Sequence, residues 1–366
     1  MSDIWKIATA GRVVVGLLAV VMLAATLWAA PAQAEAKYKW KLTTFVPQNS
    51  GAYRDFVQVF IDYVEELTEG EVEIEGFGVG ILANAFEGPK MVQQGVADIA
   101  YFYPAFLVNQ NPANAFFTGM PGGLSAEANF HWLFQGGGEK LWIDFRREEM
   151  DLHPVIAGIG PTEIFLNSHK PVRTEADLKG LKQRTAGAWA DILKGFGGSP
   201  TVLQVTEIFT SLERKLIDAT EFATPSTNIK LGYHNVAKYI IIPGIHAPSF
   251  AYEALWRKDV WDGLSDDLKR KITLAGRLAS LTGFLKTGMN DLDAMEELRA
   301  GKNEFITLSP EFVTKVRRVA RAWAEDKAAD QTKKGNPWMD RVMTSYYGFQ
   351  DRWLEFSDYR LGDEKY

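Results

Sequence analysis

An export signal at the N-terminus, combined with the absence of cysteine, limits how this chain can fold. Lys6 and Arg12 precede an apolar run over residues 13–30, and Ala32 and Ala34 stand where a signal peptidase requires small side chains. The pattern predicts cleavage after this segment. An uncleaved anchor is the alternative, because the run approaches the length of a membrane-spanning helix. An exported chain without cysteine has no disulfides, so a hydrophobic core must hold it together.

The composition allows such a core. Hydrophobic residues make up 46% of the chain and charged residues 23%, which is ordinary for a globular protein. The length of 366 residues suggests about two domains. The net charge of -6 argues against nucleic acid as a partner, because nucleic-acid binding requires a basic face. It does not exclude a small anionic ligand, since the local charge in a cleft matters more than the total.

The first part of the mature chain alternates between two periodicities. Strand patterns cover residues 38–44, 72–74 and 99–103, and helical patterns cover 53–67 and 87–96. This alternation is typical of α/β domains, in which ligands bind beyond the carboxyl ends of strands. The rule directs attention to Tyr101, Phe102 and Tyr103. Strand alternation would turn Tyr101 and Tyr103 to one side of the sheet and Phe102 to the other.

A second α/β unit and a helical end follow. The patterns predict strands over 155–166 and 237–242, helices over 174–178, 188–196 and 206–216, a long helix over 265–298, and a further helix from Ser309. We therefore expect an α/β fold, a two-lobed clamshell whose long C-terminal helices brace both lobes. The expected division is a signal peptide over 1–34, lobe I over 35–155 joined by part of 248–308, lobe II over 156–247, and the brace over 309–366.

Motifs of common enzymes are missing. The five histidines are scattered, with no His-Glu-x-x-His pair, and no Gly-x-Ser-x-Gly elbow occurs. The glycine-rich stretch over 76–80 lacks the lysine of a P-loop. The sequence therefore favours a protein that is not an enzyme.

Several segments together carry a resemblance. Residues 177–184, Asp-Leu-Lys-Gly-Leu-Lys-Gln-Arg, resemble a segment of the substrate-binding proteins of tripartite ATP-independent periplasmic (TRAP) transporters. Residues 212–219 and 232–239 are similar to two further elements of that family. Residues 116–121 and 136–138 resemble its branch that binds 2-oxo acids and lactate.

The resemblance implies a function and partners. It implies a periplasmic solute receptor that binds a small organic carboxylate, a 2-oxo or 2-hydroxy acid, and delivers it to membrane subunits of a secondary transporter. It allows a homodimer. The rival interpretations are a secreted enzyme that uses Glu163 and Glu221 as a carboxylate pair, and a binding protein that serves a sensor instead of a transporter.

The resemblance also assigns Arg184 to the ligand. The arginine of this segment binds the ligand carboxylate in the family, and a guanidinium fork matches two carboxylate oxygens. The helix from Ala188 would add the positive end of its dipole. Trp189 is expected to cover an apolar ligand tail, with core packing as an equally weighted alternative. Tyr101, Phe102 and Tyr103 are expected on the opposite wall, with core packing of at least one as the alternative.

A cation site is implied by the same branch. Glu221-Phe222 resembles a Glu-Trp pair whose glutamate and neighbouring carbonyl help to hold a cation that bridges to the ligand. Glu163 lies near a glutamine of the branch, and Ala247 after His246 stands where the branch offers a further polar group. Glu221 and Glu163 are thus candidate ligands of Na⁺ or Ca²⁺, and His246 is a candidate ligand contact. The alternative is that Glu221 accepts a hydrogen bond from a ligand hydroxyl or from an internal arginine.

Overall fold

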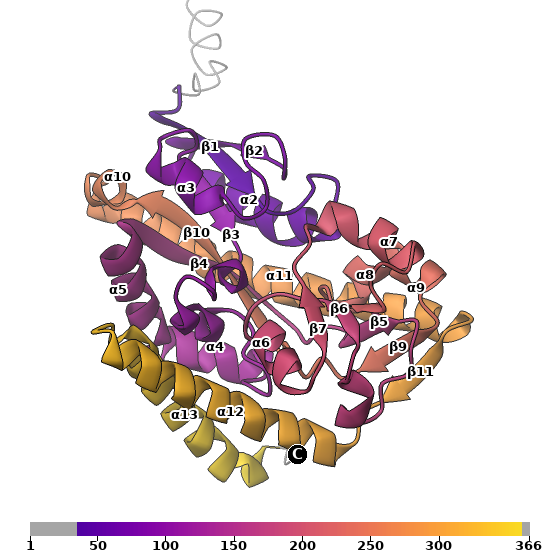
Figure 1. Cartoon of the computed structure of the whole chain (residues 1–366). Coiled ribbons are helices and arrows are strands. Elements are labelled where there is room, and N and C mark those ends of the chain that lie inside the picture. The colour runs from indigo at the N-terminus through magenta and orange to yellow at the C-terminus, as the bar shows by residue number, and fades with distance from the viewer. Residues whose placement is uncertain (1–34, 361–366) are drawn as a thin grey trace, which may run out of the picture.

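Two β-sheets form the framework of the protein (Figure 1). The computed structural model describes residues 35–360, and the predicted signal peptide lies outside this range. The first sheet has the order β2-β1-β3-β10-β4, formed by β1 (Tyr38–Thr44), β2 (Val72–Phe77), β3 (Ile99–Phe102), β4 (Leu152–Gly160) and β10 (Phe250–Arg257). The second has the order β11-β9-β5-β8-β6-β7, formed by β5 (Leu166–Ser168), β6 (Lys182–Arg184), β7 (Ser199–Thr201), β8 (Ala219–Thr220), β9 (Tyr239–Ile242) and β11 (Glu304–Thr307).

The first sheet gathers three chain segments at one edge. β1 runs parallel to β2 and β3, whereas β10 runs antiparallel to β3 and β4. The carboxyl ends of β1 and β3 therefore meet the amino-terminal part of β10. Strands were predicted correctly for β1, β2 and β3. The sequence patterns did not identify β10, whose Tyr252 belongs to this edge.

The second sheet brings Arg184 next to the residue that follows β8. β6 and β8 are parallel, and Arg184 pairs with Thr220. Arg184 and Glu221 therefore leave neighbouring strands at the same edge. The single strand predicted over 155–166 is wrong. It divides into β4 and β5, which belong to different sheets, because residues 161–165 cross between them.

The crossing at residues 161–165 lies beyond the predicted end of lobe I at residue 155. β4 continues through residue 155 to Gly160 within the first sheet. We propose that lobe I extends to Gly160 and that the chain passes between the lobes at residues 161–165 and again at 243–249.

Helices cover the sheets and account for most of the predicted helical patterns. The pattern over 53–67 forms a π-helical turn (Tyr53–Val57) and α2 (Gln58–Leu67), and the long pattern over 265–298 forms α11 (Asp266–Ala300). The remaining α-helices are α3 (Gly88–Gln93), α4 (Ala126–Phe134), α5 (Gly138–Met150), α6 (Ala188–Gly195), α7 (Val205–Glu213), α8 (Pro225–Leu231), α9 (Tyr233–Val236), α10 (Lys258–Asp262), α12 (Pro310–Lys333) and α13 (Trp338–Glu355). The pattern over 174–178 forms a short 3-10 helix (Glu175–Leu178), and further 3-10 helices cover Pro104–Leu107, Pro112–Phe117 and Ser357–Tyr359.

The long helix α11 lies across both lobes. It packs against β4 and α2 in the first lobe and against α8 in the second. Small residues make this contact close: a Cβ on Gly276 would stand 2.4 Å from the carbonyl oxygen of Ile156, and one on Gly283 would stand 2.5 Å from the Phe56 ring. The middle of the helix therefore approaches the sheet along a face formed by small residues.

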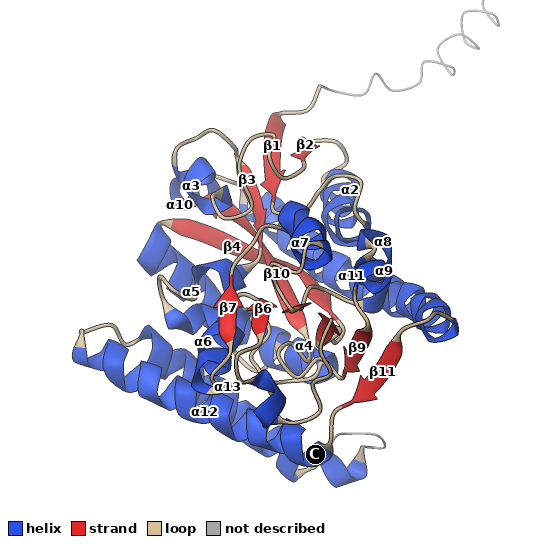
Figure 2. Ribbon diagram, turned by 45° about the vertical axis from the view of Figure 1, so that its right-hand side comes forward, coloured by secondary structure: helices blue, strands red, loops and turns tan. Residues whose placement is uncertain are grey.

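The C-terminal helices also contact both lobes (Figure 2). α12 begins as predicted, with the Ser309 hydroxyl accepting a 3.2 Å hydrogen bond from the Phe312 N–H. α12 packs against α6, and α13 packs against α4 and α5. The expected clamshell with a helical brace is thereby confirmed. Within residues 35–360, none of the helices combines the length and the apolar character that crossing a bilayer needs.

Candidate functional site

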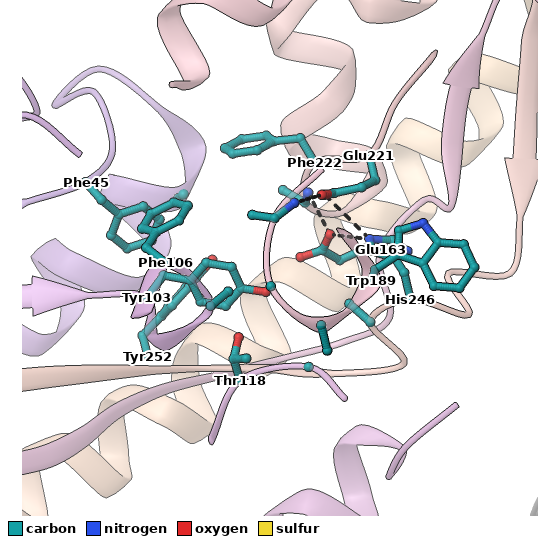
Figure 3. A pocket seen from close by; sticks show the side chains of 18 of the residues that line it. Phe45, Tyr103, Phe106, Thr118, Glu163, Trp189, Glu221, Phe222, His246 and Tyr252 are labelled. Atoms are coloured by element: carbon teal, nitrogen blue, oxygen red, sulfur yellow. Dashed lines mark hydrogen bonds and ion pairs between the residues drawn. The ribbon is translucent and has the colours of Figure 1, made fainter. Parts of the chain in front are cut away.

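A cavity lies between the two lobes and contains most of the predicted site residues (Figure 3). About 640 Å³ of empty space lies between the residues that line it, and part of this space is open to solvent. The predicted residues that line it are Tyr103, Glu163, Arg184, Trp189, Glu221, Phe222 and His246. Phe45, Phe106, Thr118 and Tyr252 complete the labelled part of its wall.

Arg184 is buried at this wall and is already held by the protein. Its Nε and Nη2 donate to the carbonyl of Leu203 over 3.2 and 3.1 Å. Its Nη1 donates over 2.9 Å to the carbonyl of Glu221 and lies 3.4 Å from the Glu221 Oε1. Because a guanidinium has five N–H groups, these contacts within the described chain leave one N–H on Nη2. The edge formed by Nε and Nη2 is therefore occupied, and a ligand would meet the Nη1–Nη2 edge.

Glu163, Glu221 and His246 form a buried cluster. His246 Nε2 lies 3.1 Å from the Glu163 Oε2 and 3.6 Å from the Glu221 Oε2. Each carboxylate also accepts a 3.0 Å hydrogen bond from a backbone N–H, Glu163 from Ala223 and Glu221 from Ala186. Each of the three side chains offers one possible metal-ligand atom, and these three atoms lie within 4.8 Å of one another.

Charge balance within the cluster favours a protonated histidine. Burial opposes the charge of His246, but the Glu163 hydrogen bond and the negative charges of Glu163 and Glu221 outweigh it and raise its pKa to about 9. Burial likewise opposes ionisation of Glu221, but the Arg184 charge and the His246 hydrogen bond hold the pKa of this carboxyl below its usual value. The raised pKa favours the protonated form of His246 at neutral pH.

The stability of the folded chain should consequently fall as the pH rises through about 9. The pKa of His246 is about 9 in the folded protein and about 6.5 in an unfolded chain. Its stabilising contribution is complete below pH ~6.5 and is lost as the pH passes the folded pKa. Urea unfolding from about pH 6 to pH 10 measures this loss. His246→Gln should remove that part of the profile, and identical profiles for the two proteins would contradict the assignment.

A strained turn positions Glu221 and the neighbouring backbone. Ala223 has a φ of 57°, which non-glycine residues rarely adopt. Its N–H faces Glu163, while the Asn228 side chain donates to the Ala223 carbonyl over 2.8 Å and to the Thr224 carbonyl over 2.9 Å. The same turn places the Phe222 ring 5.3 Å from the Arg184 guanidinium carbon. Strain that is fixed by several hydrogen bonds is typical of functional sites.

The opposite wall is aromatic and belongs to the first lobe (Figure 3). Phe45 follows β1, Tyr103 follows β3, and Tyr252 lies on β10; the ring of Tyr252 is 5.3 Å from Phe45 and 5.6 Å from Tyr103. Thr118 adds a buried hydroxyl that has no hydrogen-bond partner within the described residues. Phe45 could have been found from its position after a predicted strand. No sequence signal marked Thr118.

Two of the predicted site residues do not line the cavity. Tyr101 is in the core of the first lobe, where its hydroxyl donates a 2.9 Å hydrogen bond to the carbonyl of Ala157. Phe102 is buried in a separate cluster with α3. β3 ends at Phe102, so the strand alternation that grouped Tyr101 with Tyr103 does not extend to Tyr103. Only Tyr103 of the three reaches the cavity.

Trp189 adjoins the cavity and is also part of the hydrophobic core. It lines the cavity from the first turn of α6, yet its ring is buried against Phe165, with the centroids 5.4 Å apart. Its indole N–H donates to the Gln183 side chain over 3.4 Å. Residues 186–188 before it also line the cavity, so the amino-terminal end of α6 adjoins the Arg184 wall as expected.

Comparisons with known proteins agree on the family. The family described as bacterial extracellular solute-binding protein, family 7, matches residues 42–331. A monocarboxylate 2-oxoacid-binding periplasmic protein from Nostoc is 26% identical over 295 residues, 80% of this chain and 79% of its own.

Two solved structures share the fold. A TRAP transporter solute-binding protein from Bordetella bronchiseptica, a dimer with copurified calcium and picolinate in one site, has a TM-score of 0.82 and 21% identity over 89% of this chain and 95% of its own. A TRAP periplasmic solute-binding protein from Pseudoalteromonas atlantica, with bound sodium and pyruvate, has a TM-score of 0.81 and 22% identity over 88% of this chain and 97% of its own.

Proposed function

Because this chain belongs to family 7 of the bacterial extracellular solute-binding proteins, we propose that it is the periplasmic receptor of a TRAP-type transporter. Its ligand is a small organic carboxylate, a 2-oxo or 2-hydroxy acid, which it delivers to membrane subunits. The observation that carries this proposal is the buried guanidinium of Arg184 on the wall of a cavity between the lobes. The Nostoc relative, which binds monocarboxylate 2-oxoacids, supports the ligand class.

The ligand carboxylate would occupy the space in front of Arg184. The Nη2 N–H that remains after the contacts with Leu203 would donate to it, and the amino-terminal end of α6 would stabilise its charge. His246 also lines the cavity, and its buried Nδ1 has no partner within the described chain. A protonated His246 would therefore provide a second charged donor. The Thr118 hydroxyl on the opposite wall could then pair with an oxo or hydroxy group.

Binding of this kind would couple to closure of the lobes. Arg184 and His246 come from the second sheet and a crossing segment, whereas Phe45, Tyr103, Thr118 and Tyr252 belong to the first lobe. A ligand that contacts both walls stabilises the closed arrangement more than the open one. The aromatic wall excludes water and so strengthens the electrostatic contacts of Arg184.

The residues present fit a bridging hard cation poorly. Na⁺ and Ca²⁺ require several oxygen ligands, but the Glu163 and Glu221 Oε2 atoms both face the His246 imidazole. An imidazolium supplies the positive charge that two adjacent carboxylates and a bound anion require. We therefore propose that this receptor binds its ligand without a metal, unlike the calcium- and sodium-containing relatives.

The rival enzyme has little support in this geometry. Both carboxylates accept hydrogen bonds from the backbone and adjoin His246, and the pKa of Glu221 is lowered. A glycosidase requires one carboxyl whose pKa is raised so that it can act as an acid. A sensor-linked receptor would share the whole site, and transport by a reconstituted complex with the membrane subunits distinguishes it from a transport receptor.

A ligand screen tests the proposed function. Pyruvate, lactate and longer 2-oxo and 2-hydroxy acids are added to the mature chain in thermal unfolding experiments, each beside its amide as a matched uncharged control. A true ligand at a hundred times its dissociation constant should raise the free energy of unfolding by about 2.7 kcal/mol, and EDTA should not change this. Stabilisation by the amide as strong as by the acid, or by none of the acids, would contradict the proposal.

A further inference from the structure

One hydrogen bond joins the two lobes directly. The N–H of Ala85, in the loop between β2 and α3, donates over 3.4 Å to the side-chain Oε1 of Gln204, in the segment between β7 and α7. Within the described chain, no other hydrogen bond links residues 35–160 to residues 166–242. Neither Ala85 nor Gln204 lines the ligand cavity, so the Ala85–Gln204 contact lies outside the site described above.

On the second lobe, the contact adjoins the arginine of the proposed ligand site. The carbonyl of Leu203 accepts hydrogen bonds from Arg184 Nε and Nη2 over 3.2 and 3.1 Å. The N–H of the same peptide group belongs to Gln204 and donates over 3.0 Å to the Glu207 carboxylate in the first turn of α7. Because a peptide group is planar and rigid, a shift of Gln204 also turns the Leu203 carbonyl that holds the guanidinium.

On the first lobe, the contact adjoins the aromatic wall of the cavity. Ala85 is buried in the core of this lobe. The ring of the next residue, Phe86, lies 5.0 Å from the ring of Phe106, which lines the cavity. The Phe86 N–H donates over 2.9 Å to the Asn84 side chain, which fixes the shape of the turn. The Ala85 N–H is therefore held in place relative to the aromatic wall.

The start of α7 does not explain a glutamine at position 204. Gln204 is the N-cap residue of α7, where serine, threonine, aspartate and asparagine are the preferred residues. Their shorter side chains would serve the helix better but would not extend as far toward the first lobe. The longer side chain of Gln204 reaches the Ala85 N–H.

We propose that Gln204 is a positioning residue for ligand binding. Its contact with Ala85 connects the peptide group that orients Arg184 to the loop beside the aromatic wall. Contact between the lobes and the grip of Arg184 on the ligand carboxylate therefore strengthen each other, as two coupled equilibria must. Gln204 acts through Leu203 and Arg184 without touching the ligand. This inference rests on the proposed function, because it assumes a carboxylate in front of Arg184.

Ligand dissociation measured by stopped flow tests the role of Gln204. The probe is whichever of pyruvate, lactate and their longer homologues binds the wild-type chain most tightly. Gln204→Ser keeps a good N-cap but loses the reach to Ala85, and it should raise the dissociation rate constant about threefold to tenfold, the weight of one hydrogen bond. Gln204→Glu keeps the length and the acceptor and should dissociate at the wild-type rate. Gln135→Ser, at an exposed glutamine of the first lobe, is the matched control and should also keep the wild-type rate.

A double-mutant cycle tests the connection to Arg184. In an Arg184→Lys background, Gln204→Ser should have little further effect on the dissociation constant, because lysine no longer joins the Leu203 carbonyl to the ligand. Additive effects of the two substitutions would overturn the proposed connection. A Gln204→Ser protein with the wild-type dissociation rate, or a Gln204→Glu protein that releases the acid as fast as Gln204→Ser, would overturn the positioning role.

Hydrogen exchange of the ligand-free chain separates this inference from the proposed function. The Ala85 amide should exchange about threefold to tenfold faster in Gln204→Ser than in the wild type. Equal exchange would overturn the contact between Ala85 and Gln204, whether or not an acid binds. If no acid binds the wild type, the proposed function fails and the positioning role fails with it. If an acid binds the wild type and Gln204→Ser releases it at the same rate, this inference fails alone.

Discussion

Replacing Arg184 with lysine should weaken the binding of the carboxylate ligand by about 1.5–3 kcal/mol, the range of a hydrogen bond between charged groups. Arg184 reaches Leu203 and Glu221 at the same time, and the proposed ligand would take the N–H that remains on Nη2. A lysine ammonium keeps the charge but cannot make these contacts together, because its three donors share one atom. Isothermal titration with the best acid from the ligand screen measures the loss.

The matched control for this variant is Arg214→Lys, at an exposed arginine of the same lobe. It should bind the acid as tightly as the wild type. Circular dichroism should show that both variants are folded. A folded Arg184→Lys protein with unchanged affinity would remove Arg184 from the ligand site, whatever the ligand proves to be.

Replacing His246 with glutamine should destabilise the folded chain by about 3–5 kcal/mol, the cost of removing one partner from a buried ion pair. Glutamine retains a donor for Glu163 but carries no charge. Glu163 and Glu221 would then face each other with no positive group between them, although Arg184 still contacts Glu221. Urea unfolding at neutral pH measures the difference, with His131→Gln at an exposed position as the control.

The same variant should acquire a metal dependence that the wild type lacks. With His246 replaced, the two carboxylates form an oxygen-rich site, and millimolar Ca²⁺ should restore part of the lost stability and ligand affinity. EDTA should abolish that recovery and leave the wild type unchanged. A wild-type protein that loses its affinity in EDTA would show that a cation bridges the ligand in this receptor, as the resemblance first implied.

Local patterns in the sequence determined much of the secondary structure. The alternation over 38–44 and the helical spacing over 53–67 depend only on which faces of an element are apolar, and both match the structure. The cap at Ser309 and the long helix over 265–298 are equally local. The two errors concern segments that show no clear periodicity. The strand β10 was missed because it is buried almost throughout, so its polar and apolar residues do not alternate. The stretch 155–166 was predicted as one strand because it is apolar both before and after the point where the chain crosses from one sheet to the other.

The candidate site also contains residues that local sequence patterns identified and contacts that only the fold creates. The segment around Arg184 and the pair Glu221-Phe222 were found from short motifs, because each motif lies within a few neighbouring residues. The contact of His246 with Glu163 spans 83 positions in the chain, and two crossings between the lobes bring these residues together. Neither a sequence motif nor the presence of a histidine at position 246 predicts that contact. Only the tertiary structure decided that a histidine lies beside both carboxylates, because folding brings segments that are far apart in the sequence into contact.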